Sequence, residues 1–566
     1  MGARSCAARR DIGVPALILV VSAILAVAPA ALAQEDPAGT MPRTITSRPL
    51  PGQDRGVATV ARYQEPPVAA APGAAGREEE PNTGRNPPVA PSEGGLPGGG
   101  LGEPSVIPAP GAQGEEGPDD LVFLAEPAVV TMAADYIAEP QVGRKGDRML
   151  VTWNYGAAQS WDGGSTFAYL DPFTAFPWAG DGFCCDQLVA YLPAHDLWVW
   201  VLQYLRSPGP TGENLLRVAV AAGDEAFDSS EFDYWDFTAQ GFGFPDGLML
   251  DLPKLGWTDD ALVLSINVYQ PEEPDGDGTL DASVVWRVPI EGLLAKDLSG
   301  VRYFTTIDYT DAYGWPLFNP FPLRGSGDTM VLASHVDDST LGIWTWPDDS
   351  DDIDFRTVTS RLPSGDPLAF PSGSYDCPML DALDPEASDW CTFNDPRIRG
   401  GWRSGDRVGF AWNVPQAQGW EVDYPWVFAT ELDLATIDAC DDGGCVVGHP
   451  SVYLPDRAVQ YLAVAPDARG DLGGVALAGG GEYALQCLGL VRDADATSGA
   501  GWDPVLVADS DAESPAARSG DYLGVTPLGA DASAWTASCM TQHASGDWPE
   551  THVHVASFGR RHDVME

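Results

Sequence analysis

The amino-acid sequence predicts an all-β protein, a β-propeller of seven blades that follows a disordered N-terminal segment. Short apolar stretches lie between clusters of Gly, Pro and Asp, and no long stretch repeats with the period of a helix. One frame, an Asp followed by an apolar run, recurs seven times between residues 147 and 531. A ring of similar sheets buries such strands and leaves no long exposed edge. Six or eight blades are the alternatives to seven.

The repeated frame is clearest in GDRMLVTWN at 146–154 and GDRVGFAWN at 405–413, where an Asn follows the Asp by seven residues. The Asp is expected to open a turn, and the strand after it to be covered on both faces by neighbouring blades. A segment at 121–130 is expected to close the ring beside 553–558. The anchoring residues are Asp147, Asp196, Asp260, Asp328, Asp406, Asp471 and Asp531.

The N-terminal region reads as an export signal and a linker. Arg9 and Arg10 precede an apolar run and the cleavage-site sequence Ala31-Leu32-Ala33, which predicts a signal peptide over residues 1–33. An uncleaved membrane anchor and twin-arginine export are the alternatives. Residues 34–118 are rich in Pro, Gly, Ala and Glu and predict a disordered linker. The propeller is expected over 119–560 and a short tail over 561–566.

The net charge and the number of cysteines limit the classes of partner and the cellular compartment to be expected. The formal net charge of −51 repels nucleic acid and anionic membranes, so neither is an expected partner. Eight cysteines follow the predicted signal, and an even number in an exported chain predicts disulfides in an extracytoplasmic protein. Cys440 and Cys445 flank a turn and are expected to pair locally. Cys184 and Cys185 either pair with each other or with separate partners.

The stretch SWDGGSTF at 160–167 carries the most specific motif. It matches the pattern Ser-x-Asp-x-Gly-x-Thr-aromatic at Ser160, Asp162, Gly164, Thr166 and Phe167. The chain thereby resembles the Asp-box (BNR-repeat), sialidase-like β-propellers, closest to uncharacterised secreted bacterial members. The resemblance implies that this motif is a folding element placed away from the catalytic face. A degenerate copy, SGDWPETH at 545–552, is expected in the corresponding part of the last blade.

In a propeller the innermost strands meet at the axis, and seven segments are expected to begin them. They start at 139, 186, 253, 319, 395, 460 and 521. Polar residues at these starts predict a polar channel mouth that binds the ligand. The residues expected to bind are Glu139, Asp186, Lys254, Asn319, Asp395, Arg397, Asp521 and Tyr522. The alternative for each single residue is a strand cap or a turn.

Two functions follow. The first is ligand binding without turnover, to a carbohydrate or an extracellular protein, with exposed tryptophans such as Trp178 and Trp402 available to stack on sugars. The second is glycoside hydrolysis, with Asp186, Asp395, Asp521 and Tyr522 as catalytic candidates. Resemblance to hydrolysing sialidases implies three arginines on a substrate carboxylate and a Tyr–Glu nucleophile pair. Only Arg324, Arg397, Arg399 and Arg518 lie near the expected innermost strands, and three of them cannot be assigned to such a clamp.

Metal chemistry is expected at one loop at most, and no organic cofactor is implied. DGDGTLD at 275–281 spaces oxygen ligands as a Ca²⁺ loop does, although the Glu that completes an EF-hand is missing. A solvated acidic loop is the alternative. The residues involved are Asp275, Asp277, Thr279 and Asp281. His552 and His554 share a strand face, but two histidines without a third ligand do not make a site.

Overall fold

The computed structural model describes part of the compact unit Thr40–Glu566. The described residues are 41, 43–65, 121–134, 137–207, 212–270, 280–312, 314–337, 340–359, 377, 390–391, 394–416, 424–442, 444–494, 501–511, 520–529, 533–543 and 550–564. The predicted signal peptide lies outside this set. No helix in the described part of the chain is long and apolar enough to cross a membrane.

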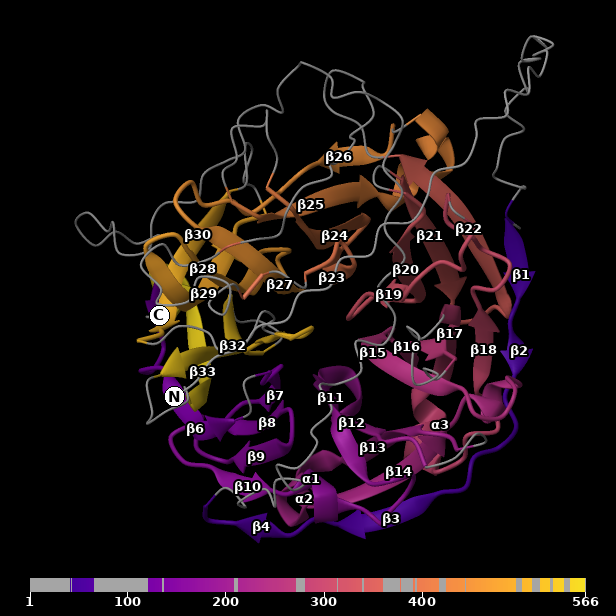
Figure 1. Cartoon of the computed structure of the whole chain (residues 1–566), viewed down its shortest axis with the longest axis horizontal. Coiled ribbons are helices and arrows are strands. Elements are labelled where there is room, and N and C mark those ends of the chain that lie inside the picture. The colour runs from indigo at the N-terminus through magenta and orange to yellow at the C-terminus, as the bar shows by residue number, and fades with distance from the viewer. Residues whose placement is uncertain are drawn as a thin grey trace, which may run out of the picture. The chain divides into compact units, whose positions relative to one another are not determined.

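Seven antiparallel sheets follow one another around a common axis, which confirms the predicted seven-bladed propeller (Figure 1). The innermost strands contact their neighbours in turn and close the ring where β7 (Gln141–Lys145) meets β31 (Gly524–Pro527). Each innermost strand starts close to the position predicted for it, because its start is marked by local Pro and polar residues.

The first four blades share one order, from the innermost strand outward. Blade 1 contains β7, β8 (Arg148–Trp153), β9 (Gly156–Ser160) and β10 (Ala168–Leu170). Blade 2 contains β11 (Phe183–Leu192), β12 (Leu197–Tyr204), β13 (Leu215–Ala222) and β14 (Glu231–Phe237). Blade 3 contains β15 (Met249–Trp257), β16 (Ala261–Tyr269), β17 (Leu280–Pro289) and β18 (Arg302–Thr305). Blade 4 contains β19 (Phe321–Pro322), β20 (Thr329–His335), β21 (Thr340–Pro347) and β22 (Asp352–Thr359).

The remaining blades complete the ring. Blade 5 contains β23 (Ile398–Ser404), β24 (Arg407–Val414), β25 (Trp426–Asp433) and β26 (Val446–Gly448). Blade 6 contains β27 (Ala458–Pro466), β28 (Leu472–Gly480), β29 (Tyr483–Arg492) and β30 (Trp502–Asp509). Blade 7 contains β31, β32 (Ala534–His543) and β33 (Glu550–Arg560). The few helices are short and lie in connections: α1 (Pro172–Ala175), η1 (Pro193–His195), α2 (Gly223–Ser229), η2 (Gln240–Phe242), α3 (Ile290–Ala295), η3 (Leu434–Asp442) and α4 (Arg561–Val564).

Strand direction defines two ends of the propeller. We call the end where the innermost strands begin the mouth end, and the opposite end the base end. Because successive strands alternate in direction, the connections from second to third strand and from blade to blade lie at the mouth end. The connections from first to second and from third to fourth strand lie at the base end.

The repeated Asp has a structural role at the base end. In five blades its backbone carbonyl accepts a hydrogen bond from the amide just after the third strand, at distances of 2.8–3.0 Å. This bond ties the two base-end connections of a blade together, so the frame recurs wherever a blade is built. The five residues are Asp147, Asp196, Asp260, Asp328 and Asp406.

Outer strands from the N-terminal region were not anticipated. Residues 44–63, expected within the disordered linker, form four short strands that run along the outer edges of blades 4, 3, 2 and 1 in that order (Figure 1). Short strands attach by backbone hydrogen bonds to sheet edges, so little apolar sequence marks them. Residues 66–120 lie outside the described residues. The four strands are β1 (Thr44–Thr46), β2 (Arg48–Pro49), β3 (Gly56–Thr59) and β4 (Arg62–Tyr63).

The ring closes as predicted. Strand β5 (Leu121–Phe123) pairs with β33, with Phe123 opposite Phe558, and β6 (Ala128–Ala134) pairs farther along the same strand. The outer edge of the last blade is therefore supplied by sequence that precedes the first blade.

The disulfides are also resolved. Cys440 pairs with Cys445 as predicted, and Cys184 pairs with Cys185 as a vicinal bridge. Two further bridges join Cys377 to Cys391 and Cys487 to Cys539.

Hydrogen bonds within residues 160–166 hold the connection from β9 to β10 closed. Asp162 accepts from the Thr166 amide at 2.9 Å and from its hydroxyl at 2.6 Å, and Ser160 accepts from the Gly164 amide at 3.0 Å. The loop lies at the base end, where third and fourth strands connect. Residues 545–549 of the degenerate copy at 545–552 lie outside the described residues. Its last three residues begin β33, the third strand of blade 7, so the copy does not follow a third strand as residues 160–167 do.

Candidate functional site

Polar residues from several blades meet on the axis near the mouth end. Tyr522 donates its hydroxyl proton to Asp186 at 2.9 Å, although their blades are separated by blade 1. The Lys254 ammonium, from blade 3, lies 4.2 Å from the centre of the Tyr522 ring. All three residues are buried. These contacts between blades that are not neighbours show that side chains of different blades meet near the axis.

Two arginines and two aspartates form the charged part of this axial cluster. Arg397 donates to Asp395 at 2.8 Å and lies 3.3 Å from Asp521. Arg399 donates to Asp521 at 2.8 Å and lies 3.6 Å from Asp395. Each guanidinium therefore faces both carboxylates, so the two charges of each sign are balanced within the cluster.

Glu139 and Asn319 complete the set of predicted residues in different ways. Glu139 accepts from the Asp521 amide and from the Asn154 side chain at 3.1 Å, so it belongs to the axial cluster. Asn319 donates to the Leu252 carbonyl at 3.0 Å, while its own amide is held by Asn267 and Ser283. Asn319 therefore links blades 3 and 4, and its hydrogen bonds to described residues do not reach the charged groups.

Arg399 and Arg324, which the sequence places near the innermost strands but outside the set expected to bind, also belong to this neighbourhood. Arg324, from blade 4, donates to Gln141 of blade 1 at 3.2 Å across the axis. Arg399 comes two residues after Arg397, and alternation along a strand would have placed both side chains on one face. Among the described residues no group of three free arginines forms a clamp, and Arg518 lies outside them.

Register shifts and left-handed backbone conformations occur where these side chains leave the innermost strands. The ladder between first and second strands is shifted near the mouth end in blades 2, 3, 5 and 6. Glu139, Leu252 and Asn319 have φ of 48°, 58° and 45° and each precedes a proline. Left-handed φ at such residues is unfavourable and is found where a fold holds side chains in a required direction. A repeated x-Pro step before the innermost strand was the available sequence signal.

The cluster changes the acidity of its members. Burial, reinforced by Arg397, lowers the pKa of Lys254 to about 7. Burial by itself would raise the pKa of Asp395, but Arg397 and Arg399 outweigh it and lower that pKa. Burial and then Asp186 raise the pKa of Tyr522 well above its usual value. At neutral pH Asp395 is therefore an anion and Tyr522 a neutral phenol.

Lys254 is a charged group whose ammonium has no hydrogen-bond acceptor among the described residues. Only 4% of the residue is exposed, yet within the described part of the chain no acceptor lies within hydrogen-bond distance of its ammonium. The face of the Tyr522 ring lies 4.2 Å away, and the carboxylates of Asp521 and Asp186 attract the ammonium without a hydrogen bond. A buried ammonium without acceptors is costly, so this position suits a ligand atom that accepts hydrogen bonds.

Exposed aromatic side chains surround the mouth end. Trp178, in the connection from blade 1 to blade 2, is 70% exposed and rests on Gly182, and Trp315, between blades 3 and 4, is 45% exposed. Trp402, expected to be exposed, is 1% exposed because it packs between blades 5 and 6. Among the tryptophans that the structure describes, Trp178 and Trp315 are therefore the ones with an exposed ring.

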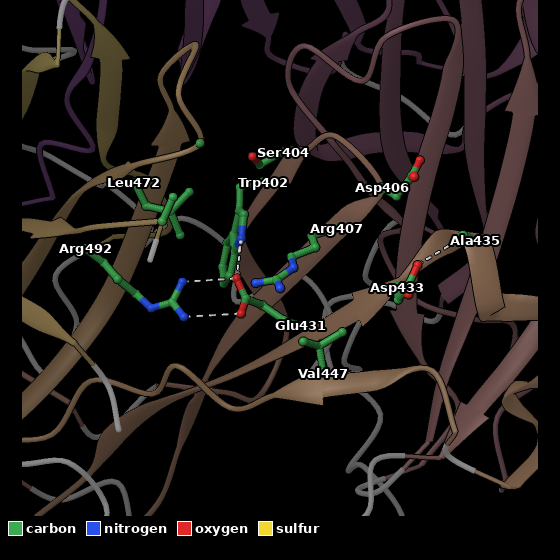
Figure 2. Close-up of a pocket in the computed structure, with 12 residues that line it drawn as sticks. Trp402, Ser404, Asp406, Arg407, Glu431, Asp433, Ala435, Val447, Leu472 and Arg492 are labelled. Carbon is green, nitrogen blue, oxygen red and sulfur yellow. Dashed lines mark hydrogen bonds and ion pairs between the residues drawn. The ribbon is translucent and has the colours of Figure 1, made fainter. Parts of the chain in front are cut away.

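A separate cavity of about 490 Å³ opens between blades 5 and 6 at the base end (Figure 2). Figure 2 shows Glu431 directed towards Trp402 and Arg492, which donate to its carboxylate at 3.3 Å and 3.2 Å. Glu431 is thus neutralised by its neighbours. Trp402 lines this cavity, whereas none of the residues predicted for the channel mouth does.

The predicted Ca²⁺ loop stays a prediction. Asp275, Asp277 and Thr279 lie outside the described residues. Asp281 is the second residue of β17, and its carboxylate accepts a hydrogen bond from the Gln270 side chain at 2.8 Å.

Comparison with known proteins does not place the chain in a family. No family model and no curated protein matches the chain. Among solved structures, a protein of unknown function from Dyadobacter fermentans is 9% identical and the match covers 78% of this chain and 99% of that one, with a TM-score of 0.37. The Neurospora crassa Pan2 WD40 domain is 10% identical over 79% and 97% of the two chains, with a TM-score of 0.36. The Trypanosoma rangeli sialidase is 8% identical over 67% and 54%, with a TM-score of 0.31.

These similarities are too low to carry an argument about activity. The class is therefore defined by the molecule itself, as a seven-bladed β-propeller with a buried charged cluster on its axis.

Proposed function

We propose that this chain is an exported binding propeller of the Asp-box, sialidase-like group, which holds a carbohydrate at its mouth end without turnover. The observation that carries the proposal is Lys254, a buried ammonium that lacks an acceptor beside the mouth. Exposed Trp178 adds a flat apolar face of the kind on which sugar rings stack. The four disulfides fit an oxidising compartment.

The carboxylates of the axial cluster are poorly suited to catalyse hydrolysis. A glycosidase needs one carboxylic acid that is still protonated near neutral pH and a second carboxylate at a set distance. Asp395 and Asp521 instead share two guanidinium groups, and the pKa of Asp395 is lowered. Both are therefore suited to hold Arg397 and Arg399 in place rather than to transfer protons.

Glycoside hydrolysis is the second candidate, favoured by one observation. Tyr522 donates to Asp186, and a carboxylate beside a tyrosine can act as the base that activates it as a nucleophile. The raised pKa of Tyr522 opposes this role, since the phenolate is the reactive form. An extracellular protein ligand is the third outcome that the experiment can return.

A glycan array and a panel of chromogenic glycosides test these proposals with the purified full chain. We expect binding to one class of glycan and no hydrolysis. Trp178→Ala and Lys254→Met should each weaken binding at least tenfold. Matched controls are Tyr63→Ala and Lys296→Met, which lie away from the mouth and should bind as the wild type does.

Two outcomes would contradict the proposal. Hydrolysis by the wild type that is lost in Tyr522→Phe would establish the second candidate. Neither binding nor hydrolysis would remove the carbohydrate ligand and leave a protein ligand as the alternative.

A further inference from the structure

We propose that three histidines at the mouth end of blade 7 form a binding site for a transition-metal ion such as Zn²⁺. The residues are His543 at the end of β32 and His552 and His554 near the start of β33. One nitrogen from each ring can be chosen so that all three lie within 4.8 Å of one another. A modest side-chain rotation would bring them to the separation found in a His₃ site.

Strand register explains why the third histidine joins the other two. His552 and His554 are two residues apart on β33, so they share one face of the sheet. Thr541 lies opposite His552 and Glu550 opposite His543 in the pairing of the two strands. His543 is therefore a diagonal neighbour of His552, and their ring centres are 4.0 Å apart.

Thr541 sits between two of the rings. Its hydroxyl oxygen lies 2.8 Å from His543 Nε2 and 2.6 Å from His554 Nε2. A hydroxyl carries one hydrogen, so it donates to one of these nitrogens and accepts from the other. The two Nε2 atoms thus converge on one point. A metal ion could replace these hydrogen bonds by taking the lone pair of the accepting Nε2 and, once the proton of the donating Nε2 has moved to Nδ1 of the same ring, the lone pair of that nitrogen.

Carboxylates flank the cluster in the arrangement that supports metal-binding histidines. Asp511 Oδ1 lies 3.2 Å from His543 Nδ1, and Glu550 Oε2 lies 4.0 Å from His552 Nε2. A carboxylate on Nδ1 holds the proton there and leaves the lone pair on Nε2. Asp511 comes just after the last strand of blade 6, so this support reaches His543 from the neighbouring blade.

The donor set favours a particular class of ion. Three imidazole nitrogens suit Zn²⁺, Cu²⁺, Ni²⁺ or Co²⁺, whereas Ca²⁺ and Mg²⁺ require oxygen ligands. Three protein ligands leave a fourth position, which Glu550 or water can fill. His543 and His552 have side chains 22% and 14% exposed, so an ion can reach the cluster from solvent. Side-chain packing alone would explain the stacked rings of His543 and His552. It does not explain why a third histidine joins them and why Asp511 faces the His543 ring nitrogen.

Calorimetry on the untagged full chain, stripped with a chelator and desalted, tests the site with Zn²⁺ and then Co²⁺. We expect one Zn²⁺ per chain, a rise in melting temperature on its addition, and visible Co²⁺ absorption of a nitrogen-ligated ion. His543→Gln and His552→Gln should each weaken binding at least tenfold. Asp511→Asn should weaken it about 10–100-fold, as removal of a supporting carboxylate does.

The control is His195→Gln, which changes a partly exposed histidine whose ring nitrogen is bonded to the Asp259 carbonyl. It should bind Zn²⁺ as the wild type does. Melting temperatures of the stripped variants establish that each is folded before metal is added. The proposal is overturned if the wild type binds no Zn²⁺, or if folded His543→Gln and His552→Gln bind it unchanged.

Discussion

Tyr522 donates its phenolic proton to Asp186 across the propeller axis, and the two residues are 336 positions apart in the chain. The bond joins the segment before β31 to β11, which belong to blades that do not touch along their innermost strands. Lys254, from a third blade, covers the Tyr522 ring. The axis at this level is thus held by specific polar contacts rather than by apolar packing.

Tyr522→Phe should lower the free energy of unfolding by about 1–2 kcal/mol, because it removes a buried hydrogen bond to a charged acceptor. The ring remains, so the contact with Lys254 is kept. Chemical denaturation measures the change. Tyr63→Phe is the control, since that side chain is exposed on an outer strand and should change stability little. Equal effects of the two variants would contradict the assigned bond.

Lys254→Met should stabilise the protein relative to the wild type increasingly as pH falls from about 10 to 7. The folded pKa is about 7 and the ordinary value is 10.5, so between these values the unfolded chain binds the extra proton. The stability of the wild type therefore rises with pH in this window, by about 1 kcal/mol per pH unit. The difference from the variant should be constant below pH 7.

Denaturation at a series of pH values compares the two proteins. Lys296→Met is the control for the loss of a lysine, because Lys296 has a 44% exposed side chain outside the axial cluster. A difference for Lys254→Met that does not change with pH would show that its ammonium is not desolvated.

Asp521→Asn should cost about 3–5 kcal/mol, because it leaves Arg397 and Arg399 buried with one carboxylate fewer. Asp224→Asn is the matched control. Its side chain is 44% exposed and pairs with Lys145, so the loss should be at most about 1 kcal/mol. Unfolding midpoints in denaturant give both values. A smaller loss for Asp521→Asn than for Asp224→Asn would rule out the balanced cluster.

The bridge between Cys487 and Cys539 joins β29 of blade 6 to β32 of blade 7 and closes a loop of 52 residues. Replacing both cysteines by Ala should lower the free energy of unfolding by about 4 kcal/mol through the greater freedom of the unfolded chain. Removing Cys440 and Cys445, which are five residues apart, should cost less. Thermal unfolding of the two double variants tests the order.

The N-terminal strands should stay attached when the chain is cut between residues 66 and 118, where the sequence predicts a linker. Strands β1 to β4 pair with four blades, and Arg62 also donates to Ser230 at 2.8 Å and covers Trp161. Limited proteolysis followed by gel filtration should yield both fragments in one peak. Separate elution of the N-terminal fragment would show that these pairings are weak.

Local patterns in the sequence were enough to predict the blades. The Asp frame, the Pro steps and the apolar runs each concern residues within one hairpin, and the turn at Asp147 or Asp406 is decided by its neighbours along the chain. The start of each innermost strand followed from the same signals. The sequence was therefore enough to identify polar residues that lie on the axis, but not the residues that they contact there.

Tertiary structure alone decided which residues meet. Arg399 reaches Asp521 and His543 reaches His552 through strand pairing and ring closure, and neither leaves a mark in the local sequence. The strands within 44–63 were missed for a related reason: they bind sheet edges through their backbone, which any short segment can do. The local sequence determines where the strands and turns of each hairpin form. Which distant hairpins come into contact depends on closure of the ring, and closure depends on all seven blades together.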